Sequence, residues 1–568
     1  MSPILGNTSL DRFDVLVIGS GASGGAVAEM LTRNGQKVLV LEAGSNYFAG
    51  IDQPGTMPYP AFGNDELKLL HRYQIAPDPL AEPRTFRHSV ADGDRLAVGD
   101  YANFAKTVGG GATHADLKTP RFMPDDFRLG TLFGDAFAGA SFADWPVGYD
   151  ELEPFYVHAE RLMGVQGAAQ VDPFAGPRSA PFPMPPGAAM YVAARVAQGI
   201  ASSGYTMFPC PTAVNSVPYD GRPACNDCGF CQSHPCAINA KGSPGVTTLR
   251  KALLSGNCQL HAETRVIRLV TDGAGTMITG VEAILPDGSR GMFTADRYVL
   301  AANPIEDARL LFLSGGGSAL GNTSGMVGRN LMLHHGVNVL GVFEDQLHGH
   351  RGRGSTHAFS DFRQPGKFRD QPVGGIVVVT TVPFLIQQAL TYLNQFGVLG
   401  IRGLSLKKLL RQARPRDRLL SLSMYGEDAP QPSNTVDLDP AVRDIDGIPV
   451  ARVTYQAHAG FEIAAEQYYV PKMIDIVGAA GARFGAQAPN GDPPSAGHIM
   501  GTLRFGTDPT RSVCRPDGRF HDIANLYGTG ASLFPTSSGF NPTLTITMLA
   551  SYVAASMVSP GSPERALG

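Results

Sequence analysis

Hydrophobic and polar positions near the start of the chain change from a strand-like to a helix-like pattern and back. Residues 14–18 form a short, apolar and β-branched run, which predicts a buried strand. Between residues 26 and 31 apolar side chains recur at helical spacing, which predicts a helix with one apolar face. Residues 37–41 are again short and apolar, so the pattern predicts a strand, a helix and a second strand in succession.

The loop between the first strand and the helix has the spacing G-x-G-x-x-G, formed by Gly19, Gly21 and Gly24. In dinucleotide-binding units these glycines allow a tight turn, a close approach of backbone N–H groups to a pyrophosphate, and close helix packing. The N-terminus of the helix adds a partial positive charge. Glu42 ends the second strand, where its carboxylate can accept hydrogen bonds from a ribose without a 2′-phosphate. The complete context favours a bound dinucleotide over a plain structural turn.

Length and composition describe a large globular protein. A chain of 568 residues can bury a sizeable core and divides into two or more domains. The apolar fraction of 43% and the charged fraction of 17% are ordinary for such proteins. Since the net charge is −4 and no long basic run occurs, we expect no nucleic-acid partner.

The sequence shows neither the basic and apolar regions of a secretory signal at its start nor a run of 18 uncharged apolar residues. Its most apolar stretch, residues 374–386, is interrupted by Pro383 and is too short to cross a bilayer. We therefore expect no membrane span and a cytoplasmic location.

Three consecutive glycines, residues 109–111, precede His114. Because such a run costs backbone entropy on folding, a close approach of the backbone to a cofactor is the expected reason for it. His114 then has two interpretations, a structural histidine or a residue in contact with the ring of the cofactor.

Four of the seven cysteines gather in one loop with the spacing C-x2-C-x2-C-x4-C: Cys225, Cys228, Cys231 and Cys236. This density suggests metal or redox chemistry more than a disulfide framework. An iron–sulfur cluster is one interpretation, although the last spacing and the position of Pro235 differ from the usual ferredoxin run. A zinc site is a second, and a cysteine-rich loop with free or singly paired thiols is a third. We favour the third and assign no metal.

The middle of the chain returns to strand-like patterns. Four such stretches occur between residues 258 and 301, one of which contains Val266, and we expect them to complete a doubly wound sheet. A helix is expected at residues 307–313. Between about residues 336 and 500, apolar or alternating stretches predict an antiparallel sheet.

A second group of candidate residues lies near the C-terminus. Residues 526–530 form a strand that ends in small residues, among them Gly530, where a backbone can lie against a cofactor. Asn541, Pro542 and Thr543 then open a helix whose N-terminus can stabilise negative charge. His498 precedes both segments. From the residues alone it is equally a histidine satisfied in a turn and a proton acceptor.

Taken together, these motifs resemble those of the glucose–methanol–choline (GMC) oxidoreductases, which are FAD-dependent alcohol oxidases and dehydrogenases. The resemblance covers nearly the whole chain and includes Val327-Gly328-Arg329-Asn330. It implies an α/β fold in which a Rossmann-like FAD-binding domain is interleaved with an α+β substrate domain that contains a large antiparallel sheet. The expected ranges are 1–170, 225–335 and 500–568 for the FAD-binding domain, and 171–224 and 336–499 for the substrate-binding domain.

The resemblance also implies a catalytic pair, His498 with Asn541. An imidazole can take the hydroxyl proton of an alcohol near neutral pH, while the amide can orient the same oxygen. The hydride would go to flavin N5. The cofactor-binding residues that follow from the glycine loop and from the resemblance are Gly19, Gly21, Gly24, Glu42, Gly110, Gly111, His114, Val266, Gly530, Asn541, Pro542 and Thr543.

Residues 112–115 resemble the segment of pyranose oxidases in which a histidine is tethered to FAD, so covalent attachment through His114 is a hypothesis. The same likeness favours a sugar, glycoside or polyol as substrate. The alternatives are an apolar or aromatic primary alcohol, suggested by residues 374–386, and a redox-silent lyase reaction on the same scaffold. The cysteine loop resembles that of flavin sugar dehydrogenases that carry an iron–sulfur cluster, although the spacing differs. Oxygen, a quinone or a redox protein remain as electron acceptors.

Overall fold

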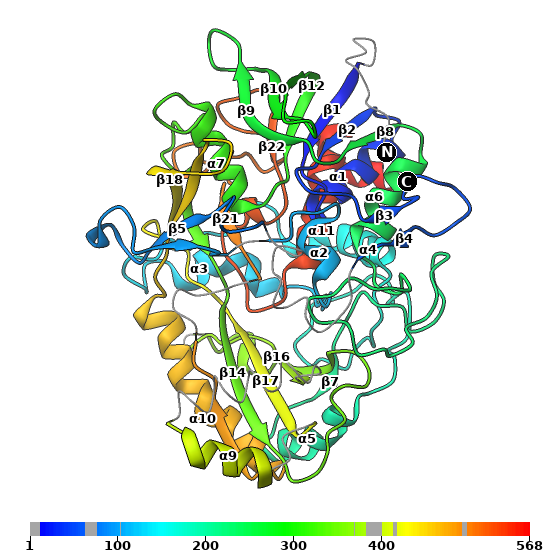
Figure 1. Cartoon of the computed structure of the whole chain (residues 1–568), viewed down its shortest axis with the longest axis vertical. Coiled ribbons are helices and arrows are strands. Elements are labelled where there is room, and N and C mark those ends of the chain that lie inside the picture. Colours follow the sequence, from blue (N-terminus) through cyan, green and yellow to red (C-terminus); the bar gives the residue numbers. More distant parts are fainter. Residues whose placement is uncertain are drawn as a thin grey trace.

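A computed structural model describes residues 12–62, 77–102, 104–368, 370–381, 400–412, 417–490 and 497–568. Its centre is a five-stranded sheet in the order β22–β12–β1–β2–β8, with every neighbouring pair parallel. The strands are β1 (Phe13–Ile18), β2 (Val38–Leu41), β8 (Cys258–His261), β12 (Ala295–Leu300) and β22 (Leu526–Gly528). The predicted strand–helix–strand unit is thus confirmed, and the last strand comes from near the C-terminus (Figure 1).

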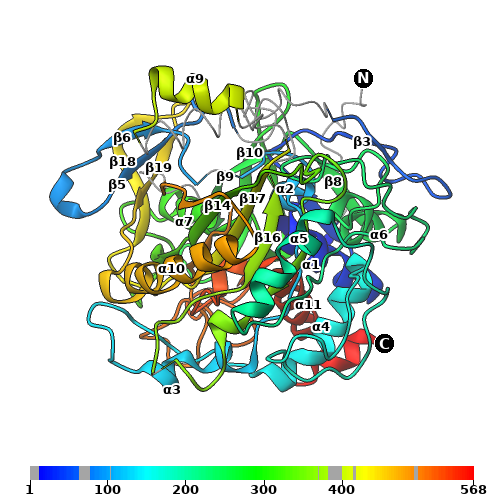
Figure 2. The ribbon, with the colours of Figure 1, turned by 90° about the horizontal axis from the view of Figure 1, so that it is seen from below.

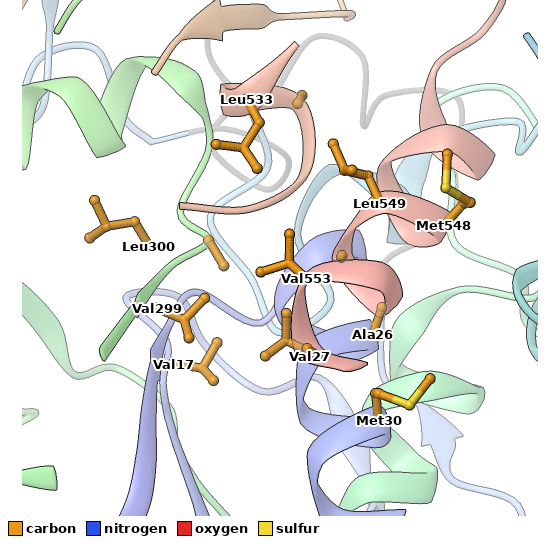
Figure 3. Packing of buried hydrophobic residues seen from close by; sticks show 14 of the residues in the cluster. Val17, Ala26, Val27, Met30, Val299, Leu300, Leu533, Met548, Leu549 and Val553 are labelled. Atoms are coloured by element: carbon orange, nitrogen blue, oxygen red, sulfur yellow. The ribbon is translucent and has the colours of Figure 1, made fainter. Parts of the chain in front are cut away.

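Helices from opposite ends of the chain pack together beside this sheet. They are α1 (Ala22–Arg33) and α11 (Thr543–Val558), which are in contact with each other. Figure 3 shows Val27 of α1 and Val553 of α11 beside Val17 and Val299 of two neighbouring strands. All four of these side chains are fully buried, so burial of apolar surface drives the two ends together. Two further helices pack here, α4 (Tyr149–Met163) on α11 and α6 (Thr248–Leu254) on α1.

The strands between β8 and β12 do not extend the parallel sheet, and this part of the prediction was wrong. They form a separate antiparallel sheet in the order β11–β10–β9. Its members are β9 (Arg265–Thr271), β10 (Ile278–Ile284) and β11 (Arg290–Phe293). The physical reason is the short connection through Asp287 and Gly288, a pair that favours a tight hairpin turn over a parallel crossover.

The expected antiparallel sheet is present. It has six strands in the order β20–β14–β17–β16–β15–β7. The strands are β7 (Phe208–Pro209), β14 (His335–Val342), β15 (Ser355–Phe359), β16 (Val377–Thr381), β17 (Leu419–Gly426) and β20 (Phe484–Gln487). Helices α5 (Tyr191–Ser202) and α10 (Ala464–Ala479) pack against it, and Figure 2 shows them in front of β14, β16 and β17.

A further six-stranded sheet, in the order β21–β13–β18–β19–β5–β6, stands beside α7 (Pro304–Ser314). It contains β5 (Arg84–Arg87), β6 (Ala97–Gly99), β13 (Arg329–Met332), β18 (Thr435–Arg443), β19 (Pro449–Thr454) and β21 (Met500–Thr502). The smaller elements are the pair β3 (Phe48–Ala49) and β4 (Tyr59–Pro60), and the helices α2 (Gly110–His114), α3 (Leu129–Phe133) and α9 (Gly403–Gln412). The mixed α/β fold with a large antiparallel sheet is therefore confirmed.

Within the described part of the chain, every helix is too short or too polar to span a lipid bilayer. Of the apolar stretch at 374–386, residues 382–386 lie outside the described residues. In its described part Val377 and Val379 pack into the core beneath α5 and α10.

Candidate active site

A cavity of about 280 Å³ lies at the carboxyl ends of the parallel strands, and it is lined by residues from both ends of the chain. Near the N-terminus it is lined by the β1–α1 loop and by Glu42 after β2. Near the C-terminus it is lined by residues 497–499 and by the first turn of α11. The edge where parallel strands end is the usual ligand-binding edge of such sheets.

The glycine loop presents bare backbone to this cavity. Gly19 has a φ of +100°, and an added Cβ would lie 2.6 Å from the Ala301 carbonyl oxygen. At Gly21 the nearest atom to an added Cβ is Gly110 Cα at 4.0 Å, so this side of the loop is open. The first turn of α1 is not capped by a side chain, and Ala22 and Ser23 line the cavity. Its N–H groups are therefore placed to bind an anion.

Two of the candidate glycines serve packing instead of lining the cavity. An added Cβ at Gly24 would lie 1.9 Å from the Gly19 carbonyl oxygen, which fits its expected role in helix–strand packing. At Gly530 an added Cβ would lie 2.7 Å from Ser23 Cβ. Gly530 thus lets the segment after β22 approach α1, while its neighbours Thr529 and Ala531 line the cavity.

The Glu42 carboxylate is buried but well supplied with donors. Its Oε2 accepts hydrogen bonds from the Ser20 backbone N–H (2.9 Å) and hydroxyl (2.6 Å), and its Oε1 accepts one from the Gly44 N–H (2.8 Å). Burial nevertheless raises the pKa of Glu42. Because an ionised carboxylate has about four acceptor positions, Glu42 can accept one more bond from a ligand hydroxyl.

Of the remaining candidate cofactor-binding residues, some line the cavity and one is buried away from it. Gly110, Gly111 and Val266 line the cavity, and their binding of the cofactor stays a prediction. His114 is only 3% exposed and does not line it; its ring meets the ring of Phe62 edge-on, with 5.5 Å between centroids. The structure therefore leaves the covalent attachment through His114 as a prediction.

The far end of the cavity brings together the residues expected to carry the chemistry. His498 lines the cavity, and its Nε2 lies 3.4 Å from Asn541 Nδ2. The side chain of Asn541 is buried, and the two residues that follow it, Pro542 and Thr543, line the cavity. The two residues are far apart in the sequence, so local spacing does not predict this contact. The fold creates it by placing α11 beside residues 497–499.

His498 is also surrounded by two residues that sequence reasoning did not assign. Its Nδ1 lies 2.9 Å from His334 Nδ1, and its ring centroid lies 5.3 Å from that of Tyr425. Lys118 also approaches Tyr425, with its Nζ 5.9 Å from the ring centroid. Burial, with further contributions from His334 and Lys118, lowers the pKa of His498 well below its usual value of 6.5. His498 is therefore a neutral base at pH 7.

A third unassigned group lies between the two ends. Asp307, in the first turn of α7, accepts a hydrogen bond from the Ser532 hydroxyl (2.6 Å), and burial raises its pKa to about 7. Both residues line the cavity together with Thr529. The sequence signal was weak, since an acid in the first turn of a helix is ordinary capping chemistry.

The cysteine loop shows no arrangement of metal ligands. All four thiols are free, and Cys228 is exposed. Across the described residues, no group of three or more His, Cys, Asp or Glu side chains is placed to hold a metal ion. The loop is held instead by Lys241, whose Nζ donates to the carbonyl oxygens of Ala115, Cys231 and His234.

The fold and the cavity together are those of a dinucleotide-binding protein with a neutral, half-buried histidine at one end of its site. Sequence comparison adds the family. The profile of the GMC oxidoreductases matches residues 196–336 and again residues 430–550. The paromamine 6′-oxidase of Streptomyces fradiae is 30% identical, over 94% of this chain and 89% of its own. The fructose dehydrogenase large subunit of Gluconobacter japonicus is 30% identical, over 94% and 96%.

The chain belongs to the GMC oxidoreductase family and is an enzyme. Solved structures support the fold: a formate oxidase from Aspergillus oryzae, studied for FAD modification, has a TM-score of 0.62 at 14% identity, with 96% of this chain and 98% of that chain covered. Membership in the family implies FAD as the cofactor.

The residues of the cavity fit FAD. The backbone is open at Gly21, and Glu42 keeps an acceptor position for a ribose hydroxyl. Two buried polar atoms, Thr529 Oγ1 and Asn541 Oδ1, have no hydrogen-bond partner within the described structure. Buried polar atoms are normally paired, and Thr529 lines the cavity while Asn541 contacts His498, so both atoms fit a polar ligand bound in the cavity.

Proposed function

We propose that this enzyme oxidises an alcohol group of a sugar, glycoside or polyol, with FAD as its redox cofactor. The observation that carries the proposal is the position of His498, a neutral, half-buried base that lines the dinucleotide cavity and contacts Asn541. A base at this place has the right geometry and protonation state to accept a hydroxyl proton.

In the proposed reaction each residue has a distinct role. His498 accepts the hydroxyl proton of the alcohol at Nε2, while Asn541 hydrogen-bonds the same oxygen and orients the carbon–hydrogen bond. Bound FAD supplies the two-electron acceptor for the hydrogen on that carbon. The N-terminus of α11, at Pro542 and Thr543, contributes a partial positive charge at this end of the cavity.

The other end of the cavity would hold the adenosine and the pyrophosphate. The backbone at Gly19 and Gly21 and the first turn of α1 are placed for the phosphates, and Glu42 for the ribose. Gly110, Gly111 and Val266 would line the dinucleotide between the two ends. Covalent attachment through His114, an iron–sulfur cluster on the cysteine loop and the domain boundaries given above remain predictions, as does the choice of electron acceptor.

The substrate class is supported by the names of relatives. Besides the two enzymes above, the gluconate 2-dehydrogenase flavoprotein of Pantoea cypripedii is 27% identical over 94% of this chain. The 2-methyl-1,2-propanediol dehydrogenase of Mycolicibacterium austroafricanum is 29% identical over 96%. These names share polyhydroxylated or diol substrates. The apolar alternative lacks support, because Val377 and Val379 are taken up by the core.

Anaerobic mixing with a panel of alcohols tests the proposal. The panel contains fructose, gluconate, paromamine and 2-methyl-1,2-propanediol, with benzyl alcohol as the apolar probe. We expect at least one of the first four to bleach the visible flavin absorbance, since oxidation of the alcohol must reduce the cofactor. Conversion of a substrate without bleaching would instead establish the lyase alternative, and bleaching by benzyl alcohol alone would establish an apolar substrate.

The activity should depend on pH in a way set by His498. Its neutral form is the base, and its pKa in the folded protein is lowered from 6.5. We therefore expect kcat/KM to stay level from neutral pH down to about 6.5 and to fall only at lower pH, as His498 becomes protonated. A profile of kcat/KM between pH 4 and 8 checks this, and an acid limb centred above pH 6.5 would contradict it.

A further inference from the structure

His334 and His498 meet nitrogen to nitrogen inside the protein. His334 lies between β13 and β14, and His498 lies just before β21. Their Nδ1 atoms are 2.9 Å apart, and the two rings are nearly perpendicular, at 89° with 4.9 Å between centroids. A hydrogen bond between two ring nitrogens needs one donor and one acceptor, so the two histidines cannot carry protons independently.

The other nitrogen of His334 decides which of them is the donor. His334 Nε2 lies 3.2 Å from the Ser537 carbonyl oxygen. Because a carbonyl oxygen can only accept, the proton of neutral His334 must be on Nε2. Its Nδ1 therefore has a free lone pair and accepts a hydrogen bond from His498 Nδ1–H.

The Ser537 carbonyl is itself held in place by buried groups. The Ser537 hydroxyl accepts a hydrogen bond from the Asp428 N–H at 2.9 Å. The adjacent Ser538 donates its N–H to Glu427 Oε1 (3.1 Å) and its hydroxyl to Asp126 Oδ2 (2.8 Å). Arg363 forms salt bridges to both Asp126 and Glu427, and none of these three charged side chains is exposed. The carbonyl is thus a fixed acceptor.

From this chain of contacts we propose that His334 is a positioning residue that holds His498 in the tautomer with a proton on Nδ1 and a lone pair on Nε2. That lone pair faces Asn541 at the end of the cavity, where the substrate hydroxyl is expected. In the opposite tautomer Nε2 would be a donor and could not accept the hydroxyl proton. The inference rests on the proposed function, because it explains how the base of that reaction is kept ready.

The hydrogen bond between His498 and His334 remains stabilising after proton transfer. The alcohol O–H bond breaks, an N–H bond forms at His498 Nε2, and the ring becomes an imidazolium. Its Nδ1–H then donates to neutral His334 as a charged donor, and such hydrogen bonds are stronger than neutral ones. No proton needs to move between the two rings.

The buried surroundings keep His334 in the accepting state. Burial, with a smaller contribution from the Arg363 guanidinium and against the opposing hydrogen bonds to the backbone of Ser537 and Ser538, lowers the pKa of His334 to about 4. Lys118 disfavours a positive charge on His498. Asp428, next to His334, binds the Leu333 N–H and the Tyr455 hydroxyl (2.9 Å). A pKa of about 4 leaves His334 neutral near pH 7.

Substitution of His334 tests the inference. His334→Phe keeps an aromatic ring but removes the acceptor, whereas His334→Asn keeps an acceptor oxygen near the position of Nδ1. With the panel substrate that reduces the wild-type enzyme, we expect the phenylalanine variant to lose about 10²–10⁴-fold in the limiting rate of flavin reduction. Its apparent substrate dissociation constant and FAD content should change little. The asparagine variant should keep the rate within about tenfold.

The controls separate this inference from the proposed function. His335→Asn alters the neighbouring histidine, which pairs with Glu466 and does not line the cavity, and it should reduce flavin at the wild-type rate. A wild-type rate in His334→Phe, or an equal loss in His334→Asn, overturns the inference. A wild-type rate in a His498→Gln variant overturns the proposed function instead. If the phenylalanine variant fails to bind FAD, the smaller His334→Leu carries the same expectation.

Discussion

We expect the replacement of His498 with glutamine to lower the rate constant of flavin reduction by about 10²–10⁴-fold, which is the usual contribution of a positioned general base. Glutamine retains hydrogen-bonding capacity in the cavity but cannot accept a proton at neutral pH. FAD should remain bound, because the glycine loop, Glu42 and the first turn of α11 are unchanged. Stopped-flow reduction under anaerobic conditions measures the rate, and the flavin absorbance per chain measures FAD content.

His335→Gln serves as the matched control for this experiment. It makes the same substitution at a histidine that hydrogen-bonds Glu466 on α10 and lies outside the cavity lining. If the His498→Gln variant loses the expected flavin-reduction rate while His335→Gln keeps the normal rate, His498 is the proton acceptor. If the His498 variant reduces its flavin as quickly as wild type, the proton is removed by another group.

Alanine substitutions at two glycines of the same loop should have opposite consequences. Gly24→Ala forces a Cβ to within 1.9 Å of the Gly19 carbonyl oxygen, and this overpacking should lower the free energy of unfolding by about 1–3 kcal/mol. Gly21→Ala places its Cβ in the open cavity, 4.0 Å from the nearest atom. That variant should fold normally but bind FAD about tenfold more weakly, because the methyl group keeps the pyrophosphate from the backbone.

Two measurements distinguish these glycine variants. The melting temperature of the apoprotein reports the packing defect, and titration with FAD reports the binding defect. Each variant is the control for the other, since both change one loop glycine to alanine. A normal melting temperature for Gly24→Ala, or unchanged FAD affinity for Gly21→Ala, would contradict the roles assigned to these residues.

Local pattern predicted the parallel core well, because its elements carry strong and unambiguous signals. Residues 15–18 and 38–41 are buried on both faces, and α11 is apolar over most of its length. The prediction was wrong for β9 and β10, since a short apolar run gives no information about the direction of its neighbour. The sequence signal for a hairpin here was the Asp287-Gly288 pair between β10 and β11. This signal is stronger than the general expectation of a doubly wound sheet.

Candidate site residues in a contiguous motif can be recognised by their spacing, and the pair His498 and Asn541 came from the family resemblance, whereas His334 was not recognised. Gly21 and Glu42 belong to one local unit with a known spacing. His334 is distant from His498 in sequence, and its neighbour His335 offers the same side chain with no role in the cavity. Only the register of β13 and β14 decides which of the two histidines faces His498, and short-range pattern does not determine that register.

The origin of the cavity from both ends of the chain has a consequence for biosynthesis. The sheet around β1 is completed by β22, and α1 is covered by α11. Both of these elements are made only after nearly the entire polypeptide has been synthesised. Until then the apolar face of α1, including Val27, lacks the helix that covers it in the finished protein. Such long-range pairing slows folding and leaves intermediates with exposed apolar surface. Truncations that remove α11 should therefore produce aggregating chains that depend on chaperones, not a smaller protein that still binds the cofactor.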